Sequence, residues 1–277
     1  MIDMTTKRTL INGVQIPCMA FGTCTVERKP YSGYTVGAVE KALRNGFRLI
    51  DTATCYENEG EVGQAMRESG ISREDIFVLT KMWNDNMRQG TQREALKYSL
   101  KELGTDYVDA YLLHWPVPGK YIESWKYMEE FYEKGLVRSI GVSNFEIDQL
   151  EALFASCKIR PMINQIEVHP YNTRKELIAF CKANDIAVMA WSPLHRGLIL
   201  NDPVLKTIAE KYGKTTAQIT LRWDIQNGVI PIPGATDEDL IRQNTQLFDF
   251  ELIQEEMAAI DALNQNLYEG DPHNFDW

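Results

Sequence analysis

The sequence lacks several features that would place it in other classes of protein. No apolar run approaches the ~20 residues that a membrane-spanning helix needs. The first residues, MIDMTTKRTLING, contain no apolar core of a signal peptide. The five cysteines form no CxxC pair and no metal-binding spacing, and an odd number without a secretion signal indicates reduced thiols. We therefore expect a cytoplasmic protein that has no membrane partner.

Positive charge is also scarce, because 39 Asp and Glu outnumber 29 Lys and Arg and give a net charge of −10. A nucleic-acid groove needs an excess of cationic groups, so we expect no nucleic-acid partner. Neither GxGxxG nor GxxxxGK[ST] occurs, which argues against a doubly wound dinucleotide-binding fold and against a P-loop. No low-complexity linker divides the chain, so we predict a single domain over residues 1–277.

What is present is a repeated alternation of strand-like and helix-like segments. The amphipathic helical patterns have recognisable ends: Thr91 and Glu94 have the spacing of a capping box, and Gly104 supplies a stop. Eight apolar runs have the length and character of strands buried on both faces of a parallel sheet. These runs are residues 19–23, 48–52, 77–83, 108–115, 137–144, 162–169, 187–194 and 228–234. Eight strands, each followed by a helix, within about 250 residues predict a (β/α)8 TIM barrel.

The two ends of the chain fall outside this alternation. Residues 8–17, RTLINGVQIP, predict a β-hairpin with Asn12-Gly13 as its turn, and we expect it to cover the barrel floor. The tail at 266–277, NLYEGDPHNFDW, shows no periodicity. We expect it to form a loop over the opposite mouth of the barrel.

Four polar residues follow or end three adjacent predicted strands: Asp51, Tyr56, Lys81 and His114. Each has an ordinary explanation, since Asp51 could cap a helix, Lys81 could be its ion-pair partner, and His114 could be a core histidine. Barrel chemistry, however, is located where the strands end. A cation near a phenol lowers its pKa, so we expect Lys81 to lower the pKa of Tyr56 and Asp51 to keep Lys81 charged. His114 would donate a hydrogen bond to a carbonyl oxygen, and no metal would be needed.

Two other groups of residues permit rival interpretations. Glu167-Val168-His169 allows a metal site, as in a metal-dependent barrel hydrolase. His169 has no second histidine two residues away, so we expect it to have a structural or rim role. Cys24 and Cys55 lie close to the predicted site, where either could be a redox-sensitive thiol or a small buried hydrophobic residue.

Eight segments follow one another along the chain: AFGTCT, RLIDTATCYENEGEVGQAM, LTKMW, DAYLLHWP, RSIGVSNF, INQIEVHPY, AWSPL and IPIPGATDEDLIRQN. Together they resemble the aldo-keto reductase superfamily over essentially the whole chain, and most closely its short-loop microbial members that act on 2,5-diketogluconate. The resemblance implies a barrel that reduces aldehydes and ketones by hydride transfer from a nicotinamide nucleotide. It implies that Tyr56 is the general acid, that Lys81 and Asp51 tune it, and that His114 orients the carbonyl. It also implies a monomer whose partner is a small carbonyl substrate.

The resemblance assigns the cofactor contacts as well. Ser143, Asn144 and Gln165 match the residues that hydrogen-bond the nicotinamide carboxamide, and Trp191 matches the aromatic residue that stacks on the ring. His195 stands where the family usually has glycine. The other expected nucleotide contacts are Gly22, Thr23, Asp51, Ser192, Pro193, Leu194, Arg196, Pro233, Gly234, Ala235, Thr236, Arg242, Gln243 and Asn244.

The sequence departs from the family pattern at the adenosine end. Gly234, Ala235 and Leu240 replace the Lys, Ser and Arg that hold the 2′-phosphate of NADPH, and residues 237–239 are acidic. Each charge-assisted phosphate contact contributes roughly 1.5–3 kcal/mol. The family default is NADP(H), but these losses predict that NADH is accepted or preferred, with Arg242 as a possible replacement cation.

The resemblance places the substrate pocket beside the four polar residues. The expected substrate contacts are Cys24, Tyr56, Trp83, His114 and Trp115, and the expected tail wall comprises Tyr268, His273, Phe275 and Trp277. An alternative function is a nucleotide-bound redox sensor or regulatory subunit with slow turnover, as in channel-associated subunits that resemble reductases.

Overall fold

A parallel sheet forms the centre of the molecule. The computed structural model describes residues 2–24 and 34–274. Within that part of the chain, each sheet strand pairs in parallel with its neighbour in sequence. The strands are β3 (Phe21–Gly22), β4 (Leu49–Asp51), β5 (Phe77–Met82), β6 (Ala110–Leu113), β7 (Ile140–Ser143), β8 (Ile163–Glu167), β9 (Ala187–Trp191) and β10 (Ile230–Pro231). All eight predicted strands are therefore confirmed, each shorter than the apolar run that predicted it.

The first and last strands of the sheet meet and close it into a barrel. Ala20 N donates a hydrogen bond to Pro231 O, and Gly22 N donates one to Pro233 O, both at 3.0 Å. Pro231 and Pro233 accept these hydrogen bonds but cannot donate any, because proline has no backbone N–H. Few hydrogen bonds therefore join β3 to β10. Gly22 permits the close approach, because a Cβ there would lie 3.1 Å from Ile232 Cγ2. The closed sheet confirms the (β/α)8 TIM barrel.

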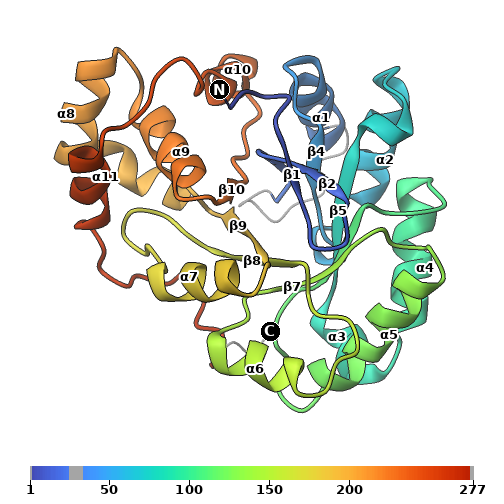
Figure 1. Ribbon diagram of the computed structural model, residues 1–277. Helices are drawn as coiled ribbons and strands as arrows, with labels where there is room; N and C mark the ends of the chain where they lie inside the picture. Colours follow the sequence, from blue (N-terminus) through green and yellow to red (C-terminus); the bar gives the residue numbers. More distant parts are fainter. Residues whose placement is uncertain (1, 25–33, 275–277) are drawn as a thin grey trace.

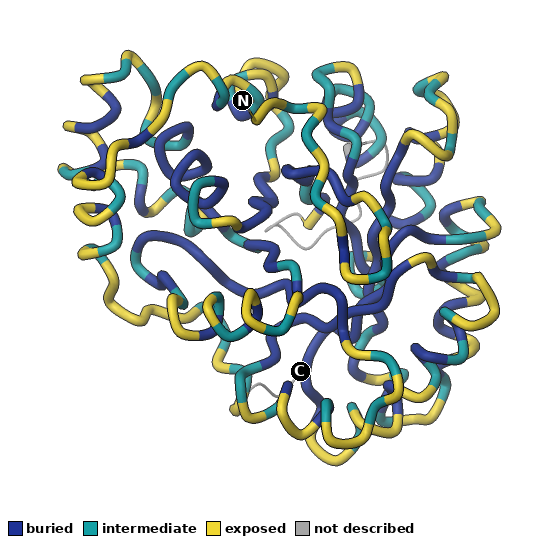
Figure 2. Tube along the Cα trace, viewed as in Figure 1, coloured by how far each residue is buried: buried dark blue, intermediate teal, exposed yellow. Residues whose placement is uncertain are grey.

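Helices surround the strands (Figure 1). They are α1 (Tyr34–Arg44), α2 (Glu59–Glu68), α3 (Asn84–Gln89), α4 (Gln92–Leu103), α5 (Tyr121–Glu133), α6 (Ile147–Phe154), α7 (Lys175–Ala183), α8 (Pro203–Tyr212), α9 (Thr216–Gln226), α10 (Glu238–Thr245) and α11 (Gln254–Asp261). The short 3-10 helices are η1 (Thr54–Tyr56), η2 (Arg73–Asp75) and η3 (His195–Asn201). Figure 2 shows buried strands inside a ring of helices whose outer turns are exposed. Every residue of β4 to β8 is buried, as expected for strands covered on both faces.

The ends of α4 confirm one sequence prediction and correct another. Gly104 ends the helix in the left-handed conformation, at φ 66°, which glycine adopts without steric cost. Thr91 precedes the helix but makes no side-chain cap, so the predicted capping box is wrong. The hydroxyl oxygen of Thr91 instead accepts a hydrogen bond of 3.1 Å from Asn86 Nδ2.

The N-terminal hairpin covers the floor of the barrel, as predicted. Its antiparallel strands are β1 (Lys7–Thr9) and β2 (Gln15–Pro17). The Arg8 guanidinium donates to Gly228 O, just before β10. Asn12 Nδ2 donates to Arg138 O at 2.9 Å, just before β7. These contacts join the hairpin to the amino ends of the strands.

The C-terminal tail lies across the opposite end. Gln265 N donates to Tyr171 O at 2.9 Å, and Glu269 N donates to Glu167 Oε2 at 2.8 Å, beside the carboxyl end of β8. The described part of the tail therefore crosses the mouth of the barrel, as predicted.

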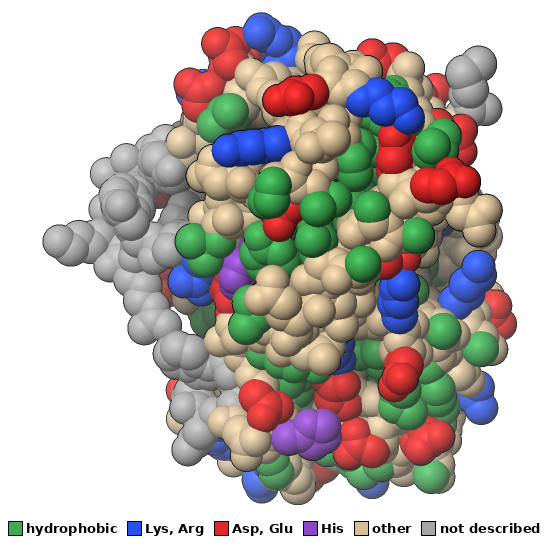
Figure 3. Space-filling model, turned by 90° about the vertical axis from the view of Figure 1, so that its left-hand side faces the viewer, with side chains coloured by type: hydrophobic (Ala, Val, Ile, Leu, Met, Phe, Trp, Pro, Cys, Tyr) green, Lys and Arg blue, Asp and Glu red, His purple; other side chains and the backbone are tan. Residues whose placement is uncertain are grey.

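On the face shown in Figure 3, Lys and Arg side chains are dispersed among Asp and Glu side chains. Among the described residues, no helix is both long and apolar enough to cross a membrane.

Candidate active site

The register of three strands brings three of the predicted site residues together. Asp51 pairs with Leu79 on β5, and Lys81 lies two residues further along that strand. Lys81 pairs with Leu112 on β6, and His114 lies two residues further again. Side chains two residues apart point to the same face of a strand. Asp51, Lys81 and His114 are therefore directed to one side at the carboxyl ends of β4, β5 and β6.

Lys81 is the centre of this group and is fully buried, with 0% of its surface exposed. Its ammonium donates 2.8 Å to the Asp51 carboxylate, 2.9 Å to Thr52 O and 3.3 Å to the Tyr56 hydroxyl. An ammonium has three donors, and all three have partners here. A buried charge is tolerated only when it is paired and hydrogen-bonded, so this arrangement keeps Lys81 charged.

Tyr56 is held over Lys81 by the short helix η1. Thr54 Oγ1 donates to Lys81 O at 3.0 Å and ties η1 to β5. Glu57 then ends η1 in the left-handed conformation at φ 56°. The Tyr56 ring centroid lies 4.9 Å from Lys81 Nζ, and the side chain is half-buried.

The pKa of Tyr56 is shifted upward, against the sequence-based expectation. Burial raises it well above its ordinary value, and Cys24 and Asp51 raise it further. The Lys81 ammonium, which also pairs with the Asp51 carboxylate, does not offset this shift. The expected net lowering of the pKa of Tyr56 is therefore wrong. The phenol is protonated at neutral pH, and it can donate a proton.

His114 is neutral at the same mouth. It is 8% exposed, and burial, with Lys81 adding to the effect, lowers its pKa well below its usual value. Cys55 Sγ lies 3.5 Å from His114 Nδ1. Burial raises the pKa of the Cys55 thiol to about 12, so the thiol keeps its proton. A thiol that donates to Nδ1 leaves the imidazole proton on Nε2, where it can serve as a donor.

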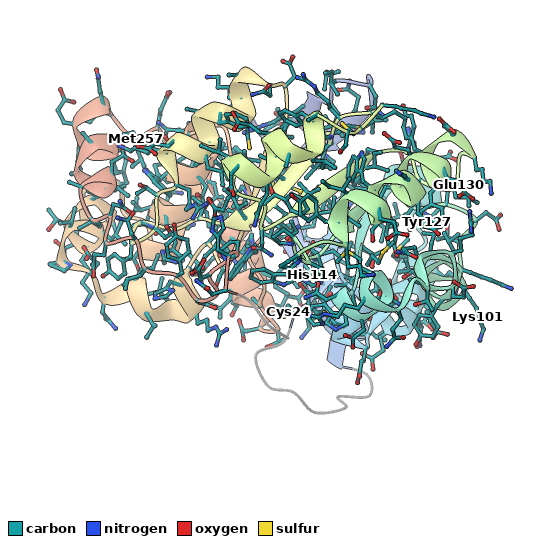
Figure 4. The ribbon with its side chains drawn as sticks, turned by 90° about the horizontal axis from the view of Figure 1, so that it is seen from below. Cys24, Lys101, His114, Tyr127, Glu130 and Met257 are labelled. Atoms are coloured by element: carbon teal, nitrogen blue, oxygen red, sulfur yellow. The ribbon has the colours of Figure 1, made fainter. Side chains whose placement is uncertain are left out.

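Aromatic rings and a cysteine surround these groups. The His114 ring meets Tyr56 edge-on at 5.8 Å and Trp83 at 5.1 Å. Figure 4 shows Cys24 and His114 near the centre of the view from below, away from the outlying labelled residues. Cys24 is exposed and half-buried Trp83 adjoins His114, but Trp115 is only 7% exposed and presents little surface to the mouth.

The residues expected to meet the nicotinamide lie next to the tetrad Asp51, Tyr56, Lys81 and His114. Gln165 Nε2 donates to Asp51 Oδ1 at 2.9 Å, which links β8 to β4 across the barrel. Ser143 Oγ donates to Gln165 O at 2.9 Å. Trp191 Nε1 donates to Asn144 Oδ1 at 2.7 Å, which fixes the plane of a half-buried indole. These amides and this ring suit a planar carboxamide-bearing heterocycle.

The loop after β9 is held by a residue that sequence reasoning missed. Glu269 of the tail accepts from Ser192 Oγ at 3.0 Å and pairs with Arg196 at 2.8 Å. The aperiodic tail carried no signal for this contact. Thr23 Oγ1 donates to Asp51 O at 3.0 Å, so the loop after β3 adjoins the same region. The remaining predicted members of the loop, Pro193 and Leu194, lie between Ser192 and Arg196.

The residues expected at the adenosine end lie in the loop after β10 and on α10. Arg242 is paired with Asp239 at 2.8 Å on the exposed surface of α10. Lys41 of α1 donates to Thr236 O at 3.0 Å, a cation near this site that sequence reasoning missed. Pro233 O accepts a hydrogen bond from Gly22 N. A Cβ on Gly234 would lie 3.0 Å from Gly22 O, so this part of the loop packs closely against β3. The other predicted residues here are Ala235, Gln243 and Asn244, of which Asn244 is buried.

Glu167, His169 and the tail complete the rim. His169 Nε2 lies 2.9 Å from Glu167 Oε1, and the His195 ring lies 4.3 Å from the His169 ring. A second histidine is thus adjacent in space although it is absent two residues away in sequence. Of the expected tail wall, Tyr268 accepts from Arg174 and His273 lies beside Asp148, while Phe275 and Trp277 are outside the described residues.

Comparison with known proteins places this geometry in a family. The model of the Aldo/keto reductase family matches residues 18–265. The chain is 49% identical to the uncharacterized oxidoreductase YtbE of Bacillus subtilis, over 98% of each chain. It is 45% identical to the glyoxal reductase of the same organism, over 93% of this chain and 92% of that relative.

A solved structure agrees in three dimensions. The Bombyx mori aldo-keto reductase in complex with NADP superposes with a TM-score of 0.89 at 41% identity, covering 97% of this chain and 95% of that chain. The family match spans nearly the whole barrel, from before β3 to beyond α11. The chain whose strands bring Asp51, Lys81 and His114 together beneath Tyr56 therefore belongs to the aldo/keto reductase family.

Proposed function

We propose that the protein is an NAD(P)H-dependent reductase of small aldehydes and ketones, including glyoxal-type dicarbonyl compounds. The observation that carries the proposal is the pairing of a protonated phenol, on Tyr56, with a neutral imidazole, on His114. Their ring centroids lie 5.8 Å apart at the same mouth of the barrel. The 45% identity to a glyoxal reductase supports this substrate class. We propose further that it acts as a single-domain monomer in the cytoplasm.

The residues present fit a nicotinamide nucleotide. When bound, the reduced nicotinamide would supply a hydride to the carbonyl carbon. Trp191 would stack on the ring, since its indole is held in plane by Asn144 and remains half-exposed. Gln165 would hold the carboxamide, and its hydrogen bond to Asp51 places that group beside the tetrad.

The tetrad would handle the oxygen of the carbonyl. His114 would donate from Nε2 to this oxygen and polarise the C=O bond. Tyr56 would transfer its phenolic proton to the same oxygen as it becomes an alkoxide. Lys81, 3.3 Å from the Tyr56 hydroxyl, would stabilise the phenolate that remains. Asp51 would balance the Lys81 charge when the phenol is neutral.

We propose that NADH is an effective cofactor. Gly234, Ala235 and Leu240 provide no cation for a 2′-phosphate, and Arg242 is already paired with Asp239. Two cations of α1 lie near this site, but Lys41 donates to Thr236 O and Arg44 is paired with Glu238. The acidic residues of 237–239 add negative charge that would repel a 2′-phosphate.

The experiment that tests the function is a pair of initial-rate assays with phenylglyoxal, one with NADH and one with NADPH. Turnover with NADH at least equal to that with NADPH would support both the activity and the cofactor proposal. A strong preference for NADPH would support the activity and contradict the cofactor proposal. Nucleotide binding without turnover would contradict the enzyme and favour a regulatory subunit.

A further inference from the structure

A buried carboxyl group, that of Glu59, lies behind the tetrad. Glu59 is the first residue of α2 and is 2% exposed. α2 packs against α4 on the outside of the barrel (Figure 1). Thr80 Oγ1 of β5 donates to Glu59 Oε1 at 2.6 Å, and Ser99 Oγ of α4 lies 3.1 Å from Glu59 Oε2. Thr80 and Lys81 point to opposite faces of β5, because adjacent side chains of a strand alternate.

A chain of hydroxyl groups joins Glu59 to the segment that carries Tyr56. Ser99 Oγ lies 3.3 Å from Thr54 Oγ1, and Thr54 Oγ1 lies 3.0 Å from Lys81 O. Thr54 and Tyr56 belong to the same short helix, η1, and the ammonium of Lys81 contacts the Tyr56 hydroxyl. The chain therefore connects the helix of the proposed proton donor to the residue that would stabilise its anion.

The number of hydrogen atoms in the chain indicates the protonation state of Glu59. Four contacts link, in order, Thr80, Glu59, Ser99, Thr54 and Lys81 O, and each needs one hydrogen atom. The hydroxyl groups supply one each, which leaves one contact without a hydrogen if the carboxyl is ionised. A protonated Glu59 supplies the missing hydrogen. All the hydrogen bonds then run in one direction, from Thr80 to Lys81 O.

The surroundings of Glu59 also favour the neutral form. Within residues 2–24 and 34–274, its carboxyl pairs with no Lys or Arg and accepts no hydrogen bond from a backbone N–H. A buried carboxylate without such partners is costly. Burial raises the pKa of Glu59, and Glu102 adds to the shift.

Only one cation faces Glu59 from the elements packed around it. The titratable groups there are Cys55 of η1, Lys81 of β5, Tyr98 and Glu102 of α4, and Tyr111 of β6. Lys81 is the cation, but its three donors have other partners. The packing therefore leaves the carboxyl with hydroxyl groups as its hydrogen-bond partners.

We propose that Glu59 is a positioning residue for Tyr56 and acts in its neutral form through Ser99 and Thr54. The proposal rests on the proposed function of Tyr56 as the proton donor. With Glu59 neutral, Ser99 donates to Thr54, and Thr54 donates to Lys81 O. This last hydrogen bond fixes η1 on β5 and so holds the Tyr56 hydroxyl 3.3 Å from the Lys81 ammonium. With Glu59 ionised, Ser99 would turn to the carboxylate, and Thr54 would lose its donor.

The test measures kcat, KM and nucleotide affinity of the full-length protein with phenylglyoxal and the preferred nucleotide. The key variant is Ser99→Ala, which removes the middle of the chain from a fully buried position on α4. The matched control is Ser124→Ala. Ser124 is also fully buried on a helix, α5, but its hydroxyl accepts from Gln92, outside the chain. Glu59→Ala and Glu59→Gln complete the set.

We expect kcat to fall by about 3- to 10-fold in Ser99→Ala and in Glu59→Ala, the size of one net hydrogen bond, at nearly unchanged KM and nucleotide affinity. Glu59→Gln should recover most of the loss, because its carboxamide donates to Ser99 and accepts from Thr80 as the protonated acid does. Ser124→Ala should match the wild type. In a Thr54→Val background, Ser99→Ala should cost nothing further, since both act through the same contact.

A second measurement tests the proton on Glu59 without any turnover. The infrared difference spectrum between the wild type and Glu59→Gln at neutral pH should contain the C=O stretching band of a protonated carboxyl. Other protonated carboxyl groups contribute to both proteins and cancel in the difference. The band should shift when the wild type is exchanged into D₂O.

Several results would overturn the proposal. These are a wild-type kcat in Ser99→Ala, a kcat in Glu59→Gln as low as in Glu59→Ala, or additive losses for Ser99→Ala and Thr54→Val. Absence of the infrared band would equally overturn it, because Glu59 would then be ionised. If Ser99→Ala is misfolded by circular dichroism, Thr54→Val takes its place with the same expected loss. A wild type without turnover would contradict the proposed function, and the infrared band would then decide the state of Glu59.

Discussion

Lys81 Nζ lies 3.3 Å from the hydroxyl oxygen of Tyr56 and 2.8 Å from the Asp51 carboxylate. The ammonium is therefore shared between a carboxylate, which keeps it charged, and a phenol, whose anion it would stabilise. Because burial raises the pKa of Tyr56, the phenol is protonated before any reaction. Before the reaction, Lys81 contacts a neutral phenol. Once the phenol has lost its proton, the same contact is an ion pair, so the stabilisation is strongest when the proton is transferred.

Replacing Tyr56 with phenylalanine should remove nearly all turnover and leave nucleotide binding intact. The hydroxyl is the proposed proton donor, and loss of a general acid typically costs ~10²–10⁴-fold in rate. Initial rates with phenylglyoxal measure the loss, and quenching of tryptophan fluorescence measures the nucleotide affinity. Tyr98→Phe, on the exposed face of α4, is the matched control and should be fully active. Retained activity in Tyr56→Phe would disprove the role.

Adding a cation at the adenosine end should shift the cofactor preference toward NADPH. Leu240 is 52% exposed on α10, so Leu240→Arg can be accommodated without repacking. A charge-assisted phosphate contact of roughly 1.5–3 kcal/mol corresponds to a gain of about 10- to 150-fold in kcat/KM for NADPH relative to NADH.

Leu240→Gln is the control for this experiment, because it adds polarity and length without charge. The ratio of kcat/KM values for the two cofactors should change little in Leu240→Gln. An unchanged ratio in Leu240→Arg would mean that the 2′-phosphate does not come near α10.

Cys55 should influence catalysis through the tautomer of His114. Its thiol lies 3.5 Å from Nδ1, and Cys55→Ala would allow the imidazole proton to move to that nitrogen. His114 would then present an acceptor to the carbonyl oxygen, and we expect kcat to fall by about 3- to 10-fold, the size of one net hydrogen bond. Cys55→Ser restores a donor and should recover most of the loss in kcat at unchanged nucleotide affinity. Equal kcat values for the two variants would exclude this positioning role.

Asp224 should make the protein less stable as the pH rises. It is 0% exposed on α9, neither carboxylate oxygen has a hydrogen-bond partner, and burial raises its pKa well above its usual value. The folded state therefore keeps a proton that the unfolded chain releases above its pKa of about 3.9. Stability is fully present below that pH and is lost at up to about 1.4 kcal/mol per pH unit as pH rises toward the folded pKa.

Asp224→Asn removes this ionisation and should raise the urea midpoint at pH 8 by much more than at pH 4. The exposed Asp106→Asn is the control and should leave the pH profile of the midpoint unchanged. Parallel profiles for the wild type and Asp224→Asn would show that the carboxyl does not resist ionisation.

The barrel could be predicted from the amino-acid sequence, because strand and helix periodicity are local properties of the chain. All eight apolar runs form strands, and the positions of Asp51, Lys81 and His114 at strand ends could be predicted from the same pattern. The family resemblance predicted Trp191 and Gln165 beside them. Local pattern failed at Thr91, where the hydroxyl pairs with Asn86 from the preceding helix and makes no cap.

The protonation states and the long-range contacts of the site depend on the folded structure. The pKa of Tyr56 depends on how deeply it is buried and on how Asp51 shares Lys81, and neither can be obtained from spacing. Glu269 meets Ser192, and His195 meets His169, only because the closed barrel brings the tail and the loops after β8 and β9 to one rim. Periodicity reports which face a residue occupies, whereas contacts between distant segments follow from how the strands close around the core.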